Sequence, residues 1–402
     1  MQLQEKEYFM KFIEEKGALI FFPEGHIDSN NASSFEKELM QALNDHPGRE
    51  PVLDAEKLKY ISSAGLRVLL RLRQNYDREI LVRNVSPEVY NIFDITGFTS
   101  MMRVEKALRF VSVKGLEIIG TGAHSTVYRL DEESILKVVH NMSLAAIRAE
   151  MQTSKNALIH GIPTAISYDV VRTEEGYGEI YEMFHAGVLP AAVMDEPERI
   201  EEFTRRFAQM YRAIHTVEIK EGELENARER YLAAADQAAP YLSEEEYGQL
   251  RKILLTIPER HTFIHGDFHM GNVMLQDDEL VLIDVGEASW GHPLLDFAQT
   301  ALAYNDLTTI HAERCRKVLG MDLEQAVYVR DHLFQMYFNE TGEALERKMT
   351  VVRAMGALRL VLIFFLQGYA ELPKDYPDIL DRARVNLFRH TDELCELIKS
   401  EF

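Results

Sequence analysis

Over residues 1–112, short apolar runs alternate with stretches of helical periodicity. The apolar runs predict strands at 18–22, 52–53 and 80–82. The amphipathic stretches predict helices at 31–43, 64–72 and 87–95. Ser86 followed by Pro87 is a typical helix start, because serine caps the first turn and proline fits its first position. Strands and helices in alternation predict an α/β domain with helices packed against a sheet.

Near residue 112 the pattern changes to a glycine-rich hairpin, and a domain boundary is expected there. Apolar runs predict further strands at 116–119, 127–130 and 134–139. Acidic, amphipathic periodicity predicts mostly helices from 190 to 260 and from 297 to 402. The run 360–366 is far shorter than the ~20 residues of a membrane span, so we interpret it as a buried helix.

Composition narrows the class of protein. The 402 residues are 46% hydrophobic and 27% charged, as in a globular protein of two or three domains. A formal net charge of -21 argues against a surface that binds nucleic acid or an anionic membrane. Cys315 and Cys395 cannot form a disulfide framework, and the N-terminus has no apolar signal core, so a cytoplasmic protein is expected.

The clearest chemical pattern is the segment 265–272, His-Gly-Asp-Phe-His-Met-Gly-Asn, with Asp284 twelve positions later. Strand-like runs flank it, so Asp267, Asn272 and Asp284 are expected on loops at strand ends. Phosphoryl transfer from a nucleotide needs one carboxylate beside the acceptor hydroxyl, and an amide and a second carboxylate on a divalent metal. A polar turn between two hairpin strands is the alternative interpretation. The full spacing favours the catalytic one.

Upstream residues could hold the phosphates. Gly120, Gly122 and Ser125 lie between two predicted strands, where backbone N–H groups and a hydroxyl could approach phosphate oxygens. Lys137 stands among apolar neighbours in a strand, and Glu150 follows in a helical stretch as a candidate partner. A plain hairpin turn and a surface salt bridge are the alternatives.

The order of these elements resembles the small-molecule kinases of the protein-kinase-like fold, such as aminoglycoside phosphotransferases and choline kinases. The resemblance covers about 113–402 and implies an α+β bilobal domain, with an N-lobe at about 113–184 and a large helical C-lobe at about 185–402. It implies that Asp267 orients the acceptor hydroxyl and that Asn272 and Asp284 bind Mg²⁺. Lys137, paired with Glu150, would hold the phosphates of ATP or GTP.

The same resemblance assigns further positions. Glu182, Met183 and Phe184 would receive the base through backbone groups at the hinge between the lobes. Asp296 would support the catalytic loop, and His292 stands where the family usually has Asp. His265 and His269 are expected to stabilise the loop through hydrogen bonds, not to bind a metal.

Two serines, Ser62 and Ser63, begin the predicted helix near residue 64. A capping role explains them, since serine oxygen accepts a helical N–H, and a phosphoserine there would also meet the positive end of the helix dipole. The segments Gly25-His26-Ile27-Asp28, Ile-Ser-Ser-Ala-Gly-Leu-Arg at 61–67 and 86–98 resemble the STAS domain of anti-sigma-factor antagonists over about 7–110. That resemblance makes Ser63 the candidate phosphosite, although Ser62 replaces an Asp that many antagonists have.

The leading hypothesis is an ATP- and Mg²⁺-dependent phosphotransferase (113–402) that acts on a hydroxyl of a small molecule and carries a STAS-like regulatory domain (1–112). The STAS domain is expected to contact a protein partner, and neither nucleic acid nor membrane is expected. Two alternatives stay open. One is a partner-switching protein whose kinase half phosphorylates a protein serine such as Ser63, and the other is a nucleotide-binding scaffold without turnover.

Overall fold

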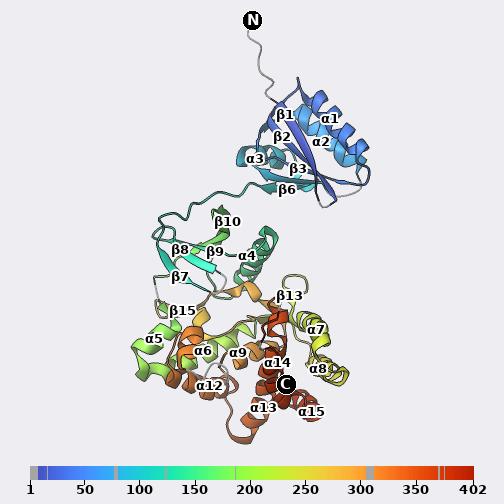
Figure 1. The fold of residues 1–402 in the computed structure, drawn as a ribbon. Helices are drawn as coiled ribbons and strands as arrows, with labels where there is room; N and C mark the ends of the chain where they lie inside the picture. The colour runs from blue at the N-terminus through green and yellow to red at the C-terminus, as the bar shows by residue number, and fades with distance from the viewer. Residues whose placement is uncertain are drawn as a thin grey trace. The chain divides into compact units, whose positions relative to one another are not determined.

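The computed structural model describes residues 8–15, 17–76, 80–122, 125–185, 187–304, 312–369, 372–374 and 376–402. The chain folds as two compact units, Met1–Val111 and Ser112–Phe402 (Figure 1). Each has its own hydrophobic core. The division falls one residue from the boundary expected from the change of pattern.

The N-terminal unit is built on a mixed six-stranded sheet. Its strands are β1 (Tyr8–Glu15), β2 (Ala18–Ile27), β3 (Glu50–Asp54), β4 (Leu58–Ile61), β5 (Leu81–Val85) and β6 (Arg103–Lys106). The order is β1-β2-β3-β5-β6, with β4 also paired to β2. Only β1 is antiparallel to its neighbour; the other pairs are parallel.

Three helices flank this sheet: α1 (Ala32–Asp45), α2 (Ser63–Asn75) and α3 (Pro87–Ile95). In Figure 1, α1 and α2 lie side by side on one face. Each buries one apolar stripe, such as Phe35 and Leu39 of α1, which are fully buried. The predicted helix start holds, because Ser86 Oγ accepts the N–H of Val89 and Pro87 is the first helical residue. The predicted α/β architecture of this unit is therefore confirmed.

The C-terminal unit begins with an antiparallel sheet in the order β10-β11-β9-β8-β7. Its strands are β7 (Ile118–Thr121), β8 (Ser125–Arg129), β9 (Ser134–Val139), β10 (Ser167–Thr173) and β11 (Gly176–Glu182). Helix α4 (Leu144–Ile159), capped by the Ser143 hydroxyl, packs against β10 and β11 (Figure 1). This is the small, sheet-containing lobe that the resemblance implied.

The rest of this unit is mostly helical. Its helices are α5 (Leu189–Asp195), α6 (Ile200–Ile214), α7 (Ala227–Ala238), α8 (Glu244–Thr256), α9 (Leu294–Tyr304), α11 (Ala312–Leu319), α12 (Leu323–Phe338), α13 (Gly342–Leu366), α14 (Tyr376–Leu387) and α15 (Thr391–Glu401). Two small three-stranded sheets lie among them. One joins β12 (Gly187–Val188), β15 (Val273–Gln276) and β16 (Glu279–Leu282), and the other joins β13 (Glu225–Asn226), β17 (Ser289–Gly291) and β14 (Thr262–Ile264).

Helix α13 contains the apolar run at 360–366. Among the described residues it is the one helix long and apolar enough to cross a membrane, yet 67% of its most apolar window is buried inside the protein. It packs against α9, α7 and α14. The burial is that of a core helix, as the sequence predicted for this run.

Candidate active site

The loop after β14 is held by helix α9. The Asp296 carboxylate, which is fully buried, accepts the backbone N–H of His265 at 2.9 Å and that of Gly266 at 2.9 Å. The ring of His215 lies 3.1 Å from the same carboxylate. Gly266 has φ +85°, and a Cβ there would lie 2.8 Å from the carbonyl oxygen of Glu287. A glycine is therefore required at this turn, and Asp296 supports the loop as expected.

The next residues of the loop are anchored in the core. The Phe268 ring stacks on Tyr211 with centroids 3.8 Å apart. The Phe268 carbonyl accepts the Thr300 hydroxyl at 2.9 Å, and Met270 N–H donates to the Tyr304 hydroxyl at 3.1 Å. With Phe268 fixed, the neighbouring Asp267 side chain is directed to the surface of the lobe, where about a third of it is exposed.

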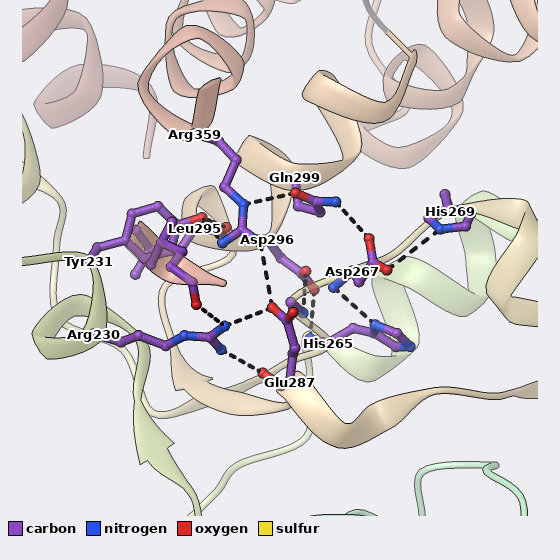
Figure 2. Close-up of polar contacts among 12 residues, drawn as sticks. Arg230, Tyr231, His265, Asp267, His269, Glu287, Leu295, Asp296, Gln299 and Arg359 are labelled. Atoms are coloured by element: carbon purple, nitrogen blue, oxygen red, sulfur yellow. Dashed lines mark hydrogen bonds and ion pairs between the residues drawn. The ribbon is translucent and has the colours of Figure 1, made fainter. Parts of the chain in front are cut away.

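Asp267 receives hydrogen bonds on both carboxylate oxygens (Figure 2). Gln299 Nε2 donates to Oδ1 at 2.6 Å. Asn272 Nδ2 donates to Oδ2 at 3.1 Å. His269 Nε2 lies 3.6 Å from Oδ2. Burial by itself would raise the pKa of Asp267, but His269 and the Gln299 hydrogen bond outweigh it and hold the pKa below its ordinary value. The carboxylate is thus oriented and kept charged.

The β15–β16 hairpin brings the two candidate metal ligands together. Val273 pairs with Leu282, and Ile283 N–H donates to the Asn272 carbonyl at 2.9 Å, so Asp284 follows directly beside Asn272. Asp284 has φ +61°, a left-handed conformation that Asp tolerates better than most residues. The Asn272 Nδ2 also donates to the Asp267 carbonyl at 2.9 Å, which leaves its Oδ1 as the acceptor oxygen. An amide oxygen and a carboxylate are donors that Mg²⁺ prefers.

Lys137 connects the two lobes. Its Nζ lies 3.3 Å from Glu150 Oε1 on α4 and 2.8 Å from Asp284 Oδ1. Burial works against the charged ammonium, but Asp284 and Glu150 raise the pKa of Lys137 above its ordinary value. Gly286 permits this approach, because a Cβ on it would lie 2.6 Å from Glu150 Cγ. The predicted Lys137–Glu150 pair is therefore present in the structure.

The glycine-rich turn joins β7 to β8. Gly120 lies in β7, Ser125 begins β8, and Gly122 N–H donates to the Ser125 carbonyl at 2.8 Å. Ala123 and His124, which belong to the same motif, lie outside the described residues. On either side of them Thr121 pairs with Thr126 in antiparallel register, and contact with phosphate stays a prediction.

The hinge segment follows β11. Met183 N–H donates to the Glu133 carbonyl at 2.8 Å, so it is already engaged. The Glu182 side chain accepts the N–H of Ile166 at 2.6 Å. Glu182 is the last residue of β11 and pairs with Ser134 of β9, and contact of this segment with a base stays a prediction.

A group of polar residues behind Asp267 was not predicted from the sequence. Arg359 Nε donates to Gln299 Oε1 at 2.8 Å, and Arg359 Nη2 lies 3.5 Å from Glu287 Oε2 (Figure 2). Arg230 Nη2 donates to the same Glu287 oxygen at 2.7 Å. One signal was available for Gln299: it lies three positions after Asp296, so both occupy one face of α9.

A buried carboxyl behind Lys137 was also missed. Glu179 of β11 is paired in register with Lys137 of β9, is almost fully buried, and accepts a hydrogen bond from the Ser167 hydroxyl. Burial, the largest effect, raises the pKa of Glu179. No alternating pattern along β11 marked it, because Gly178, Glu179 and Ile180 are all buried.

The histidines of the loop act through hydrogen bonds. His265 Nδ1 accepts Asp267 N–H at 3.2 Å, and His269 Nδ1 accepts Gly271 N–H at 3.1 Å. His292 is buried, and its Nδ1 accepts Leu294 N–H at 3.2 Å. Within the described ranges no cluster of three or more His, Cys, Asp or Glu side chains is arranged to hold a metal.

In the N-terminal unit the two serines have different roles. Ser62 is the N-cap of α2, and its hydroxyl accepts Gly65 N–H at 3.4 Å. Ser63 is the first residue of the helix and is exposed. The cap therefore does not use the Ser63 hydroxyl.

Comparisons with known proteins agree with these two units. Residues 115–331, more than half of the chain, match the model of the phosphotransferase enzyme family, and residues 10–111 match the STAS domain. The chain belongs to the phosphotransferase enzyme family and carries an N-terminal STAS domain.

Individual relatives match parts of the chain. The "Putative anti-sigma factor antagonist BtrV" of Bordetella bronchiseptica is 41% identical over 92 residues, which are 22% of this chain and 78% of that protein. Among solved structures, ADP-bound aminoglycoside phosphotransferase APH(2'')-Ib has 16% identity and a TM-score of 0.45, covering 69% of this chain and 96% of that one. A choline/ethanolamine kinase family protein from Mesorhizobium loti has 16% identity and a TM-score of 0.46, covering 71% and 93%.

Proposed function

We propose that the protein transfers the γ-phosphate of ATP, with Mg²⁺, to a hydroxyl group of a small molecule. The observation that carries the proposal is the convergence of Asp267, Asn272, Asp284 and the Lys137–Glu150 pair from distant parts of the chain. Family membership supports phosphotransfer in general. Asp267, Asn272 and Asp284 supply two carboxylates and an amide, the groups that phosphoryl transfer from a nucleotide needs.

Each group has a role that its surroundings favour. Asn272 Oδ1 and the half-exposed Asp284 carboxylate would hold Mg²⁺, which neutralises charge on the phosphates. Lys137 would contact phosphate oxygens while Glu150 keeps it extended. Backbone groups of Glu182, Met183 and Phe184 would receive the base, and Gly120, Gly122 and Ser125 would cover the phosphates.

Asp267 would act on the acceptor. Its carboxylate is fixed by hydrogen bonds and charged, so it would orient the hydroxyl. It would take the hydroxyl proton as the acceptor oxygen bonds to the γ-phosphorus, while the bond from that phosphorus to the β–γ bridging oxygen breaks and ADP leaves. The gain comes from positioning and from neutralised charge, with no covalent intermediate on the protein.

A screen of hydroxyl acceptors scored by ADP release tests this proposal. Alcohols, amino sugars and amino alcohols are supplied with Mg-ATP to wild type and to Asp267→Asn. A parallel arm supplies Mg-GTP and is scored by GDP release. Acceptor-dependent ADP release that Asp267→Asn lowers by ~10²-fold or more supports the proposal. Acceptor-dependent release of equal rate in both proteins would overturn it.

We infer a second candidate activity, transfer of phosphate to Ser63 within a signalling pathway. The observation that favours it is that Ser63 is exposed at the N-terminus of α2 while Ser62 supplies the cap. A phosphate there would meet the positive end of the helix dipole. The similarity of this unit to an anti-sigma factor antagonist supports a protein partner for the STAS domain.

Intact-mass measurement after incubation with Mg-ATP tests this second activity. One added phosphate is expected on wild type and on Ser34→Ala, which removes another exposed serine of the same unit. Ser63→Ala and Asp267→Asn should show none. A mass gain that survives in Ser63→Ala, or no gain on wild type, would remove self-phosphorylation of Ser63.

A further inference from the structure

Arg359 is a buried cation in the middle of an apolar helix. It is 2% exposed and lies between Leu358 and Leu360 of α13. A buried guanidinium is unfavourable unless charge and hydrogen bonds compensate it. Its compensation comes from Glu287 Oε2 at 3.5 Å, the Tyr231 hydroxyl at 3.4 Å and Gln299 Oε1 at 2.8 Å.

The contact with Gln299 fixes the direction of that amide. A guanidinium has donors and no acceptor, so the atom that Arg359 Nε meets must be the carbonyl oxygen of Gln299. The Gln299 NH₂ group then has to point the other way, toward Asp267 Oδ1 at 2.6 Å. Figure 2 shows the resulting chain from Arg359 through Gln299 to Asp267.

The same guanidinium reaches the metal-binding turn. Glu287 ends the 3₁₀ turn Val285–Glu287 that follows Asp284, and its carboxylate lies between Arg359 and Arg230. The Arg230 side chain also lies 3.3 Å from the Glu287 carbonyl. Arg359 therefore contacts Gln299, which bonds to Asp267, and Glu287, which lies in the turn after Asp284. It links the candidate catalytic residue to the turn that follows a candidate metal ligand.

We propose that Gln299 and Arg359 are positioning residues, which fix the rotation of the Asp267 carboxylate and couple it to the turn after Asp284. Asn272 holds one carboxylate oxygen, and Gln299, oriented by Arg359, holds the other. The carboxylate is clamped at both oxygens, and neither new residue needs to touch the substrate. This proposal rests on the proposed phosphotransferase function.

Near-isosteric variants of Gln299 in the full chain test the proposal. The probe reaction is Mg-ATP hydrolysis without added acceptor, in which water replaces the hydroxyl. Both kcat and KM are measured from pH 3 to pH 9, because the pKa of Asp267 lies below its ordinary value. Gln299→Leu should lower kcat by about 10- to 100-fold, because Asp267 loses the hydrogen bond that fixes its Oδ1. KM for ATP should change by less than about twofold, because Arg359 loses its contact with Gln299 but keeps Tyr231 and Glu287 as partners. Gln209→Leu, the same change at an exposed position of α6, is the matched control.

Gln299→Glu gives a readout that a purely structural role would not move. It places a second carboxyl 2.6 Å from Asp267 Oδ1, and two such groups share a proton. The acidic limb of the kcat profile should therefore move to higher pH by about one unit or more. The wild-type profile supplies the reference.

Arg359→Met tests the second link. It frees the Gln299 amide to turn over, so kcat should fall. In the double variant with Gln299→Leu, the fold-loss of kcat should be smaller than the product of the two single fold-losses, because both residues act through one carboxylate. Arg347→Met, an exposed position of the same helix, is its control. Should Arg359→Met fail to fold, the two Gln299 variants still decide the question.

The outcomes separate the two claims. If wild type hydrolyses Mg-ATP but both Gln299 variants keep kcat within about twofold and an unshifted pH profile, the positioning role is overturned and the phosphotransferase function stands. A loss of kcat that tracks a lowered unfolding midpoint, with an unshifted profile, also overturns it. If wild type neither binds nor turns over Mg-ATP, the proposed function fails and the positioning role falls with it.

Discussion

Replacing Asp296 by Asn should weaken the hydrogen bonds that hold the loop after β14 to helix α9. The wild-type carboxylate is fully buried and accepts two backbone N–H groups at 2.9 Å, from His265 and Gly266, while His215 lies 3.1 Å away. An asparagine keeps the shape but has one acceptor oxygen, so its NH₂ group must face one of those N–H donors. One charge-assisted hydrogen bond is lost and one buried donor is left unpaired. Together these cost about 3–5 kcal/mol in unfolding free energy.

The single tryptophan makes this loss measurable. Trp290 is buried in β17 and is paired with Phe263 of β14, the strand that leads into the loop. Urea unfolding followed by Trp290 fluorescence therefore reports on the part of the C-terminal unit that Asp296 supports. The urea midpoint of unfolding should fall, while the slope of unfolding free energy against urea concentration stays unchanged. The kcat for ADP release should fall by at least ~10²-fold.

Asp392→Asn is the control for this experiment, because it removes an exposed carboxylate that pairs with Lys252 at the surface. It should leave the Trp290 midpoint and kcat essentially unchanged. If Asp296→Asn changes the unfolding free energy by less than ~1 kcal/mol and kcat by less than about twofold, the anchoring role of Asp296 is refuted.

Three further predictions concern other contacts of the site. Lys137→Met should raise KM for ATP by about 10- to 100-fold, measured in steady-state ADP release, because a charge-assisted contact with phosphate is lost; an unchanged KM contradicts it. Gly286→Ala should also raise KM, since a Cβ 2.6 Å from Glu150 Cγ displaces that carboxylate, while urea unfolding shows a loss below ~1 kcal/mol because a side-chain end can move. Burial is the main cause that lowers the pKa of His292 to about 3. Below about pH 6.5 the imidazole therefore takes up a proton in the unfolded state but stays neutral in the folded state, so the unfolding free energy decreases as pH falls toward 3. His292→Asn should reduce the slope of unfolding free energy against pH, measured between pH 6 and 4, by up to about 1.4 kcal/mol per pH unit. An identical slope in wild type and variant would show that His292 is not a neutral buried imidazole.

The loop chemistry was predictable because it is local. Asp267, Asn272 and Asp284 stand within one strand–loop–hairpin segment, and the β15–β16 register brings the last two together. Lys137 and Glu150 were predictable from their order along the chain, and the structure places them 3.3 Å apart. The roles proposed for these residues stay predictions.

The proposed positioning residues, Gln299 and Arg359, were not predictable from their spacing along the chain. Gln299 follows Asp267 by 32 residues and precedes Arg359 by 60, and only the packing of α13 on α9 brings them together. Two signals were present in the sequence. Gln299 shares a helical face with Asp296, and Arg359 is the sole charge in the apolar stretch 354–366.

In the N-terminal unit the buried strands were predicted and the marginal ones were missed. β2, β3 and β5 contain the apolar runs at 18–22, 52–53 and, in part, 80–82. The missed strands β1, β4 and β6 are edge or short strands with exposed charged positions, such as Lys59 and Arg103. Their pairing comes from neighbouring strands, because their own sequence lacks the apolar run that marks a buried strand.

The central claim is that the loop from His265 to Asn272 catalyses phosphoryl transfer from a nucleotide. Its most direct test is ADP release from Mg-ATP by wild type and Asp267→Asn, with the affinity for Mg-ATP measured calorimetrically on both proteins. The account predicts similar affinity and a turnover at least ~10²-fold lower in Asp267→Asn. Equal turnover in the two proteins, with nucleotide bound by both, would contradict it.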